Sequence, residues 1–181
     1  INRYRDWETL KYWFRGVEKF APWVNKVYFI SDHQTPEWLN INYEKLSVID
    51  HADYIPTEYL PTFSSHPIEL NLHRIKNLSE QFVYFNDDIF LLRPISSDFF
   101  FVNQKPCDDA ILSPIIMEGK STIGKICAND MGVINTHFTK TEVMHDKTKW
   151  FHHKYGVQML RTLCLLPWHH IPGFFNDHLP Q

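Results

Sequence analysis

Apolar side chains recur at intervals of three and four residues near the start of the chain, from Trp7 to Ala21. This spacing places them on one face of a helix. Asp6 can cap the first turn of that helix, and Pro22 disfavours helical geometry in the residue before it. The pattern therefore predicts a helix that runs from Asp6 to about Phe20.

Short runs rich in β-branched and aromatic residues alternate with helical patterns over the rest of the chain. The clearest runs are apolar on both faces, which is typical of strands buried in a parallel sheet. The runs interpreted as strands are 27–30, 46–49, 82–85, 110–117 and 131–134. With helices between them, these runs predict an α/β fold whose mainly parallel sheet is flanked by helices.

Helices and loops are predicted between and after these runs. A second helix is expected from about residue 65, with Pro67 in its first turn, where a missing N–H is harmless. The sequence predicts a loop over 118–124 and one or two helices over 139–166, with a break near 155–156.

The composition is that of a globular protein. Hydrophobic residues make up 44% of the 181 residues and charged residues 22%, which excludes wholesale disorder. No apolar run approaches the roughly 20 residues of a transmembrane helix. A net charge of -3 argues against nucleic acid as the main partner. Three cysteines without a CxxC motif argue against a disulfide framework and favour a reducing compartment.

The sharpest chemical signal is the run VYFNDDIFLL at 83–92. Two adjacent carboxylates, Asp87 and Asp88, are costly in such an apolar context unless a positive group accompanies them. A divalent cation satisfies them, because Mg²⁺ takes one or two protein carboxylates and completes its shell with water and substrate phosphate. Ligands bind beyond the carboxyl ends of parallel strands, which also directs attention to Asp32 and Asp50. The alternative is a solvated turn between hairpin strands, which the Asn-Asp-Asp sequence also suits.

The second predicted helix carries a polar face formed by His66, Glu69 and His73. A zinc site on this face is one interpretation, but the HExxH spacing is missing and an ordinary polar helix face is the alternative. Arg74 differs in kind, because its planar guanidinium suits phosphate recognition and its helix leads into the run with the carboxylate pair.

Both ends of the chain carry groups suited to a substrate site. Arg3, Arg5 and Asp6 can clamp an anionic substrate, and a charged, fraying terminus is the alternative. Histidines at 169, 170 and 178 suit either general acid–base catalysis near neutral pH or structural roles. The GxSxG, Walker A and GxGxxG motifs are absent, so serine hydrolases, P-loop proteins and dinucleotide-binding proteins lose their main signals.

Read together, these segments resemble the Stealth family. Its members include bacterial capsular polysaccharide phosphotransferases and the catalytic subunit of the lysosomal-enzyme N-acetylglucosamine-1-phosphotransferase. The similar stretches are 2–39, with its NRYRD start and APW-V corner, 60–92, with its LHRI and NDD elements, and the terminal DHLPQ at 177–181. The stretch 100–170 matches weakly. Because the family's opening and final blocks are absent before Ile1 and after Gln181, the resemblance implies a single, incomplete catalytic domain over 1–181.

The resemblance implies a Rossmann-like fold related to GT-A and transfer of a hexose-1-phosphate from a nucleotide-diphosphate sugar to a saccharide hydroxyl. It also implies a divalent metal, Mg²⁺ or Mn²⁺, held by Asp87 and Asp88. The catalytic residues that it implies are His178, His73, Arg74 and Asp88. The substrate-binding residues that it implies are Arg3, Arg5, Asp6 and Asn86. Either His178 or His73 takes the proton of the attacking hydroxyl, and the sequence leaves that choice open.

Capsule synthesis by a bacterial member places the protein in the cytoplasm, at the inner face of the membrane in peripheral association with the membrane-bound capsule machinery. Two alternative functions stay open. A metal-dependent glycosyltransferase would move the sugar alone and release a nucleoside diphosphate instead of the monophosphate. A non-catalytic carbohydrate-binding module is suggested by six Trp and eight Tyr, whose rings can stack on sugars.

Overall fold

A computed structural model of the chain describes residues 8–112 and 122–165. The chain divides into two compact units, Ile1–Cys107 and Asp108–Gln181. The first unit contains the described strands, together with helix α1 and a series of short helical turns. In the second unit, the described elements are all helical. None of the helices in the described ranges is both long and apolar enough to span a bilayer.

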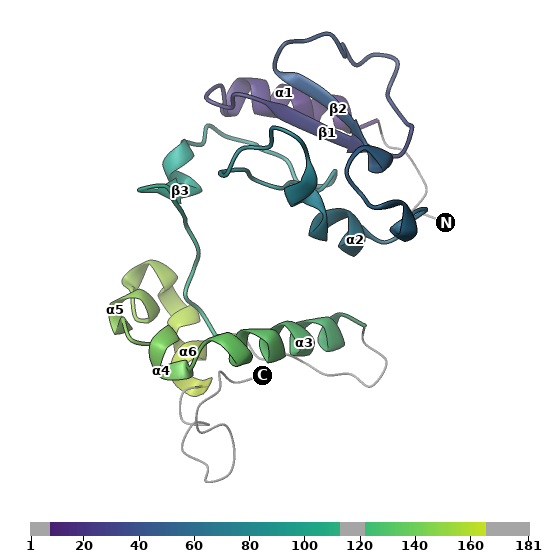
Figure 1. The fold of residues 1–181 in the computed structure, drawn as a ribbon. Coiled ribbons are helices and arrows are strands. Elements are labelled where there is room, and N and C mark those ends of the chain that lie inside the picture. Colours follow the sequence, from purple (N-terminus) through teal and green to yellow (C-terminus); the bar gives the residue numbers. More distant parts are fainter. Residues whose placement is uncertain (1–7, 113–121, 166–181) are drawn as a thin grey trace. The chain divides into compact units, whose positions relative to one another are not determined.

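A small parallel sheet organises the first unit (Figure 1). Strands β1 (Val27–Ser31) and β2 (Leu46–Asp50) pair in parallel from Val27 opposite Leu46 to Ser31 opposite Asp50. Both strands begin where the sequence predicts and extend one residue further. The carboxyl ends of both strands therefore lie at the same edge of the sheet.

Helix α1 (Leu10–Phe20) precedes β1 and packs against it, since the Phe14 and Phe29 rings meet edge to face with centroids 5.9 Å apart. The apolar spacing places Phe14 on the face of α1 that is turned to the sheet. The helix begins at Leu10, later than predicted, and the expected cap Asp6 lies outside the described residues.

A buried cluster of Tyr54, Ile55, Leu72 and Ile75 lies beneath a series of short turns that follows β2. The turns are η2 (His51–Asp53), η3 (Thr57–Tyr59), α2 (Ser65–Leu70) and η4 (Leu72–Arg74). Partly buried residues of both strands and of the turns pack against this cluster, and they are Tyr28, Ile30, Ile49, Leu60, Ile68 and Leu78.

The predicted second helix is confirmed at its start but divides in two at Asn71. The Asn71 side-chain amide donates to the Pro67 carbonyl at 2.8 Å. That carbonyl lies four residues back and would accept the Asn71 backbone N–H in a continuous α-helix. The turn that follows is a short 3₁₀ helix, and it carries His73 and Arg74.

The strand predicted over 82–85 is wrong, because the described structure pairs this segment with no strand. The Phe85 ring of this segment instead packs against Trp13 of α1, with the ring centroids 6.1 Å apart. Two hydrogen bonds hold the chain that follows it, from Ile95 N–H to the Phe20 carbonyl (3.0 Å) and from Trp23 Nε1 to the Ile95 carbonyl (2.7 Å). The remaining elements of this unit are η5 (Ser97–Phe99) and the antiparallel pair β3 (Phe101–Val102) and β4 (Lys105–Pro106).

Gly16 allows the chain that carries the carboxylate pair to approach α1 closely. A Cβ at position 16 would lie 3.0 Å from the Leu91 carbonyl oxygen, which is backbone and cannot rotate away. We expect Gly16→Val to lower the free energy of unfolding by about 1–3 kcal/mol, the usual cost of overpacking. Denaturant unfolding checks this, with Glu18→Val on the exposed face of α1 as the matched control for β-branching. Because valine is a better helix former than glycine, helix propensity alone would stabilise Gly16→Val, and a variant at least as stable as the wild type would show that the contact with Leu91 carries no cost.

The second unit is helical throughout its described part. Its elements are α3 (Thr122–His137), α4 (Lys140–Val143), α5 (Lys147–Trp150), η6 (His153–Gln158) and α6 (Met159–Leu165). The predicted helical region over 139–166 is confirmed within the described residues, and so is its break, since Gly156 has a positive φ of 53°. Two hydrogen bonds tie 110–112 to these helices, from Ala110 N–H to Tyr155 Oη (3.0 Å) and from Leu112 N–H to the buried Thr162 Oγ1 (3.2 Å).

Three predictions for the second unit are wrong at described residues. Residues 131–134 belong to α3 and form no strand, because a four-residue apolar run has the same pattern in a buried helix as in a strand. Residues 122–124 lie in the first turn of α3, and not in the predicted loop. The strand predicted over 110–117 is not formed at 110–112, and 113–121 lie outside the described residues.

The described structure is thus a mixed helix and sheet arrangement with a small parallel sheet, which is compatible with the predicted α/β class. The finer expectation of a Rossmann-like arrangement related to GT-A stays a prediction.

Candidate functional site

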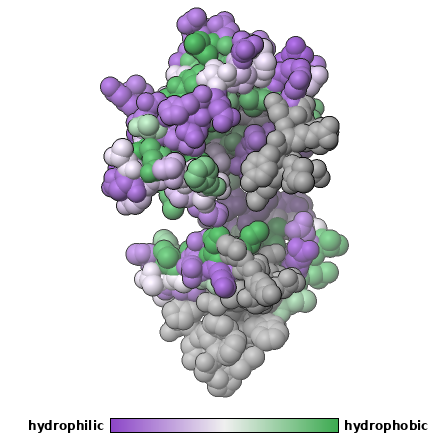
Figure 2. All heavy atoms as spheres, turned by 90° about the vertical axis from the view of Figure 1, so that its right-hand side faces the viewer, coloured by the Kyte–Doolittle hydropathy of each residue, from purple (hydrophilic) through white to green (hydrophobic). Residues whose placement is uncertain are grey.

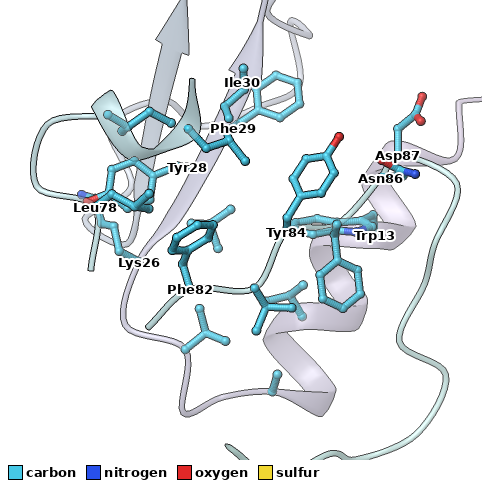
Figure 3. A pocket seen from close by; sticks show the side chains of 18 of the residues that line it. Trp13, Lys26, Tyr28, Phe29, Ile30, Leu78, Phe82, Tyr84, Asn86 and Asp87 are labelled. Atoms are coloured by element: carbon cyan, nitrogen blue, oxygen red, sulfur yellow. The ribbon is translucent and has the colours of Figure 1, made fainter. Parts of the chain in front are cut away.

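A large hollow of about 1990 Å³ opens in the first unit beside the parallel strands. Aromatic side chains form much of its lining, and Trp13, Phe82 and Tyr84 are among them (Figure 3). Apolar residues reach the surface between hydrophilic ones on the face drawn in Figure 2. The hollow exceeds the roughly 300–1,000 Å³ that is usual for a pocket that holds one small ligand.

The carboxylate pair lies at one end of this hollow. Asn86, Asp87 and Asp88 all line it, and Asn86 and Asp87 lie beyond Tyr84 in Figure 3. The three residues are exposed in a turn that the Ile89 N–H closes on the Asn86 carbonyl at 3.3 Å. The sequence pattern predicts a strand end at these residues, whereas the structure has a turn there. The turn still presents the same carboxylates to the hollow.

The two carboxylates have the chemistry of a Mg²⁺ site. Within 8–112 and 122–165, no Lys, Arg or His forms an ion pair with Asp87 or Asp88. Their oxygens are hard ligands that a divalent cation prefers. Burial raises the pKa of the nearby Tyr84, and the negative charges of Glu69 and Asp87 raise it further.

His73 and Arg74 are exposed in η4 and do not line the hollow. The His73 Nδ1 atom lies 2.9 Å from the Leu70 carbonyl of the preceding helix, so the ring is turned back along its own segment. The structure thus brings Asn86, Asp87 and Asp88 together but does not bring His73 and Arg74 to the same wall. Arg3, Arg5, Asp6 and His178 lie outside the described residues.

Polar side chains that follow the two parallel strands form a second cluster, which sequence reasoning found only in part. Asp32 and Asp50 were singled out as strand-end residues, whereas His33 was missed. The His33 ring Nδ1 lies 2.7 Å from Asp50 Oδ2, and its Nε2 lies 4.0 Å from Asp32 Oδ1. The signal for His33 was its place directly after Ser31-Asp32, since residues after parallel strands meet at one edge.

Asp50 is the centre of this cluster. Its Oδ1 accepts a hydrogen bond from the Ala52 N–H (2.9 Å), and its Oδ2 accepts one from the His33 backbone N–H (2.8 Å). The hydrogen bond from Ala52 lowers the pKa of the Asp50 carboxyl, and the bond and charge from His33 lower it further, against the effect of burial. The group is therefore a carboxylate over the neutral pH range.

The cluster also meets the distance requirement of a metal site. Ligand atoms of Asp32, His33 and Asp50 lie within 4.8 Å of one another, so the three residues can hold a metal ion. The Asp50 carboxylate already accepts hydrogen bonds from the Ala52 and His33 N–H groups, and it keeps further lone pairs with which it can bind a metal at the same time. Within the described residues, the carboxylates of Asp87 and Asp88 form no ion pair.

A hollow that receives residues from the carboxyl ends of parallel strands is the usual ligand site of an α/β protein. Residues 3–108, more than half of the chain, match the family described as Stealth protein CR2, conserved region 2. The chain belongs to the Stealth family.

Named relatives extend this similarity over nearly the whole chain. A capsular polysaccharide phosphotransferase, WcwK, of Streptococcus pneumoniae is 46% identical over 180 residues, which cover 99% of this chain and 53% of that protein. A receptor polysaccharide phosphotransferase, WefC, of Streptococcus gordonii is 49% identical over 98% of this chain and 53% of its own length. A capsular polysaccharide phosphotransferase, eps5J, of Streptococcus thermophilus is 45% identical over 98% of this chain and 73% of its own length. The chain thus spans about half the length of the first two of these relatives.

Proposed function

We propose that the protein transfers a hexose-1-phosphate from a nucleotide-diphosphate sugar to a hydroxyl of a saccharide, in the synthesis of a capsular or extracellular polysaccharide. The observation that carries the proposal is the identity of 45–49% with polysaccharide phosphotransferases over at least 98% of the chain. The carboxylate pair in the hollow agrees with it, because a diphosphate brings charge that a carboxylate-bound cation neutralises.

Asp87 and Asp88 are the residues that would hold Mg²⁺ or Mn²⁺ in this proposal. The metal supplies positive charge to the diphosphate oxygens when bound. Asn86, in the same turn, lines the hollow and can donate its side-chain amide to a substrate oxygen. Phosphoryl transfer depends on positioning and charge neutralisation more than on covalent chemistry, so a turn that presents these groups at one end of a hollow suits it.

The remaining proposed residues act on the phosphate and on the acceptor. Arg74, with Arg3 or Arg5, would stabilise the charge on the transferring phosphate, and Asp6 would belong to the same substrate contact. His178 or His73 would take the proton of the attacking hydroxyl, a role worth about 10² to 10⁴ in rate. Because Arg74 does not line the hollow as described, its contribution requires a rearrangement on substrate binding that brings it to the phosphate.

Arg74→Lys is expected to lower turnover by at least about tenfold, or roughly 1.4 kcal/mol of transition-state stabilisation. Lysine keeps the charge but loses the planar, two-pronged contact with a phosphate. Steady-state kinetics of the intact enzyme measures the change, with Lys76→Arg, an exposed cation beyond η4, as the control. Unchanged kinetics in Arg74→Lys would make Arg74 an ordinary solvated residue.

The proposed function predicts that the affinity for nucleotide sugars requires a divalent metal. Calorimetric titration with UDP-hexoses and GDP-hexoses, in Mg²⁺ and in a chelator, tests this directly. A transferase of this kind binds at least one of these donors in Mg²⁺ and loses it in the chelator. Binding of saccharides alone, with no metal-dependent affinity for any nucleotide sugar, would favour a carbohydrate-binding module.

In the same proposal, the partners are the nucleotide-sugar donor and the saccharide acceptor. The synthesis of a capsule places the protein in the cytoplasm, near the inner face of the membrane and the membrane-bound machinery that assembles the polymer. Fractionation of cells that express the intact protein tests this location.

A further inference from the structure

Asp50 holds His33 in place at the edge of the sheet where the two parallel strands end. Its backbone N–H and its ring Nδ1 both approach the same oxygen, Asp50 Oδ2, at 2.8 and 2.7 Å. The φ angle of His33 is 54°, in the left-handed region, which Asn and His adopt more readily than most residues. The double contact fixes both the backbone and the ring, so the direction of the side chain is set before any ligand arrives.

The contact with Asp50 also influences which nitrogen of the His33 ring can accept a hydrogen bond. A carboxylate oxygen can only accept a hydrogen bond, so the short contact of 2.7 Å between Nδ1 and Asp50 Oδ2 favours the ring form in which Nδ1 carries a hydrogen. In the neutral ring of that form, Nε2 is left with a lone pair. The His33 side chain is 79% exposed, whereas the Asp50 side chain is only 23% exposed, so the ring is open to a ligand while the carboxylate that holds it is largely covered.

The groups around the His33 Nε2 atom determine which kind of ligand group can bind there. His33 lines the same hollow as the carboxylate pair, while its neighbours Asp32 and Asp50 do not line it. The Asp32 carboxylate lies 4.0 Å from Nε2 and adds negative charge beside it. A phosphate oxygen would be repelled there, whereas an O–H group can donate to Nε2 and has no charge to oppose.

From these contacts we infer that His33 recognises a sugar hydroxyl, which donates a hydrogen bond to Nε2, and that Asp50 positions the ring. This inference rests on the proposed function, because a nucleotide-sugar transferase binds saccharides in the hollow. The hydroxyl can belong to the hexose of the donor or to the saccharide acceptor, and both have the same chemistry at this atom.

Two substitutions at position 33 separate recognition from a structural role. His33→Asn keeps a donor near the place of Nδ1 and suits the left-handed backbone, but it removes Nε2. His33→Gln places an amide near Nε2 but loses the Nδ1 contact with Asp50. A recognition role predicts that the Asn variant loses sugar affinity and the Gln variant retains more of it. A role confined to holding the loop predicts the reverse order, and that result would overturn the inference.

The probes are UDP and UDP-glucose, GDP and GDP-mannose, and methyl glycosides of glucose, galactose and N-acetylgalactosamine, each titrated into the intact protein with Mg²⁺. Loss of one neutral hydrogen bond predicts about a three- to tenfold weaker affinity in His33→Asn. A loss for the nucleotide sugar but not for its free nucleotide assigns the hydroxyl to the donor, and a loss for a methyl glycoside assigns it to the acceptor. His137→Asn, an exposed histidine of α3, is the control and should bind as the wild type.

The other outcomes contradict the inference in distinct ways. Unchanged affinity for every sugar in His33→Asn, with wild-type donor binding intact, overturns it and leaves the proposed function in place. An altered Mg²⁺ dependence of free-nucleotide binding would make His33 a metal ligand with Asp32 and Asp50. If the wild type binds no nucleotide sugar in Mg²⁺, the proposed function fails and the inference fails with it.

Discussion

Asp87→Asn and Asp88→Asn are each expected to weaken Mg²⁺-dependent binding of nucleotide sugars by at least about 100-fold while the fold survives. Residues that merely support a metal ligand already cost about 10- to 100-fold in metal affinity when they are changed, and a ligand itself should cost more. The fold should survive because both side chains are exposed in a turn. Calorimetry with a nucleotide sugar in Mg²⁺ measures the loss, and circular dichroism with thermal unfolding checks the fold.

A third variant is the control for Asp87→Asn and Asp88→Asn. Asp130→Asn removes an exposed carboxylate from α3, in the other unit, and should bind the donor as the wild type does. Normal donor binding by both Asp87→Asn and Asp88→Asn would show that the metal assignment is wrong. The cluster of Asp32, His33 and Asp50, whose ligand atoms lie within 4.8 Å, would then be the better candidate for the metal.

His178→Ala is expected to lower turnover by about 10²-fold or more, with donor affinity nearly unchanged. The prediction comes from the sequence, since His178 lies outside the described residues. Pro180 restricts the backbone beside it, and a neutral imidazole can accept the proton of the acceptor hydroxyl near pH 7. Removal of a proton acceptor costs the transition state and leaves donor binding intact.

A paired measurement on the intact protein decides the role of His178. Product formation and donor affinity are measured for the wild type, His178→Ala and His73→Ala. If the affinity of His178→Ala falls as much as its turnover, His178 is a binding or structural residue. A loss of turnover confined to His73→Ala would assign the proton to His73, and its Nδ1 contact with the Leu70 carbonyl would then fix the ring for catalysis.

Two strands could be predicted from the sequence because each of them is a single short run of residues with a complete strand pattern. Val27–Ser31 and Leu46–Asp50 are short β-branched runs with polar residues at their ends, and they form β1 and β2. The equally apolar run at 82–85 pairs with no described strand, and its Phe85 ring packs against Trp13 of α1 instead. The same composition suits both outcomes, and only the tertiary contacts choose between them.

Some features of the candidate site could likewise be predicted from the sequence, and others could not. The exposed carboxylates of Asp87 and Asp88 could be predicted, since adjacent acids in an apolar run stand out in any conformation. The contact between His33 and Asp50 could not, because it joins residues 17 positions apart and depends on the parallel register of β1 and β2. Likewise, the break of the second helix depends on the Asn71 side chain, whose bond to the Pro67 carbonyl competes with the helix.

The nucleotide released during transfer distinguishes a hexose-1-phosphate transferase from a glycosyltransferase. The intact protein is incubated with a donor that it binds in Mg²⁺ and with a saccharide acceptor, and the nucleotide product is identified by ³¹P NMR. Transfer of a hexose-1-phosphate forms a bond between the acceptor oxygen and the sugar-bearing phosphorus, and the broken phosphoanhydride leaves as the nucleoside monophosphate. A hexose-1-phosphate transferase releases the monophosphate and leaves a phosphodiester signal in the saccharide. Release of the nucleoside diphosphate, with no phosphorus in the saccharide, would contradict the proposed function and identify a glycosyltransferase.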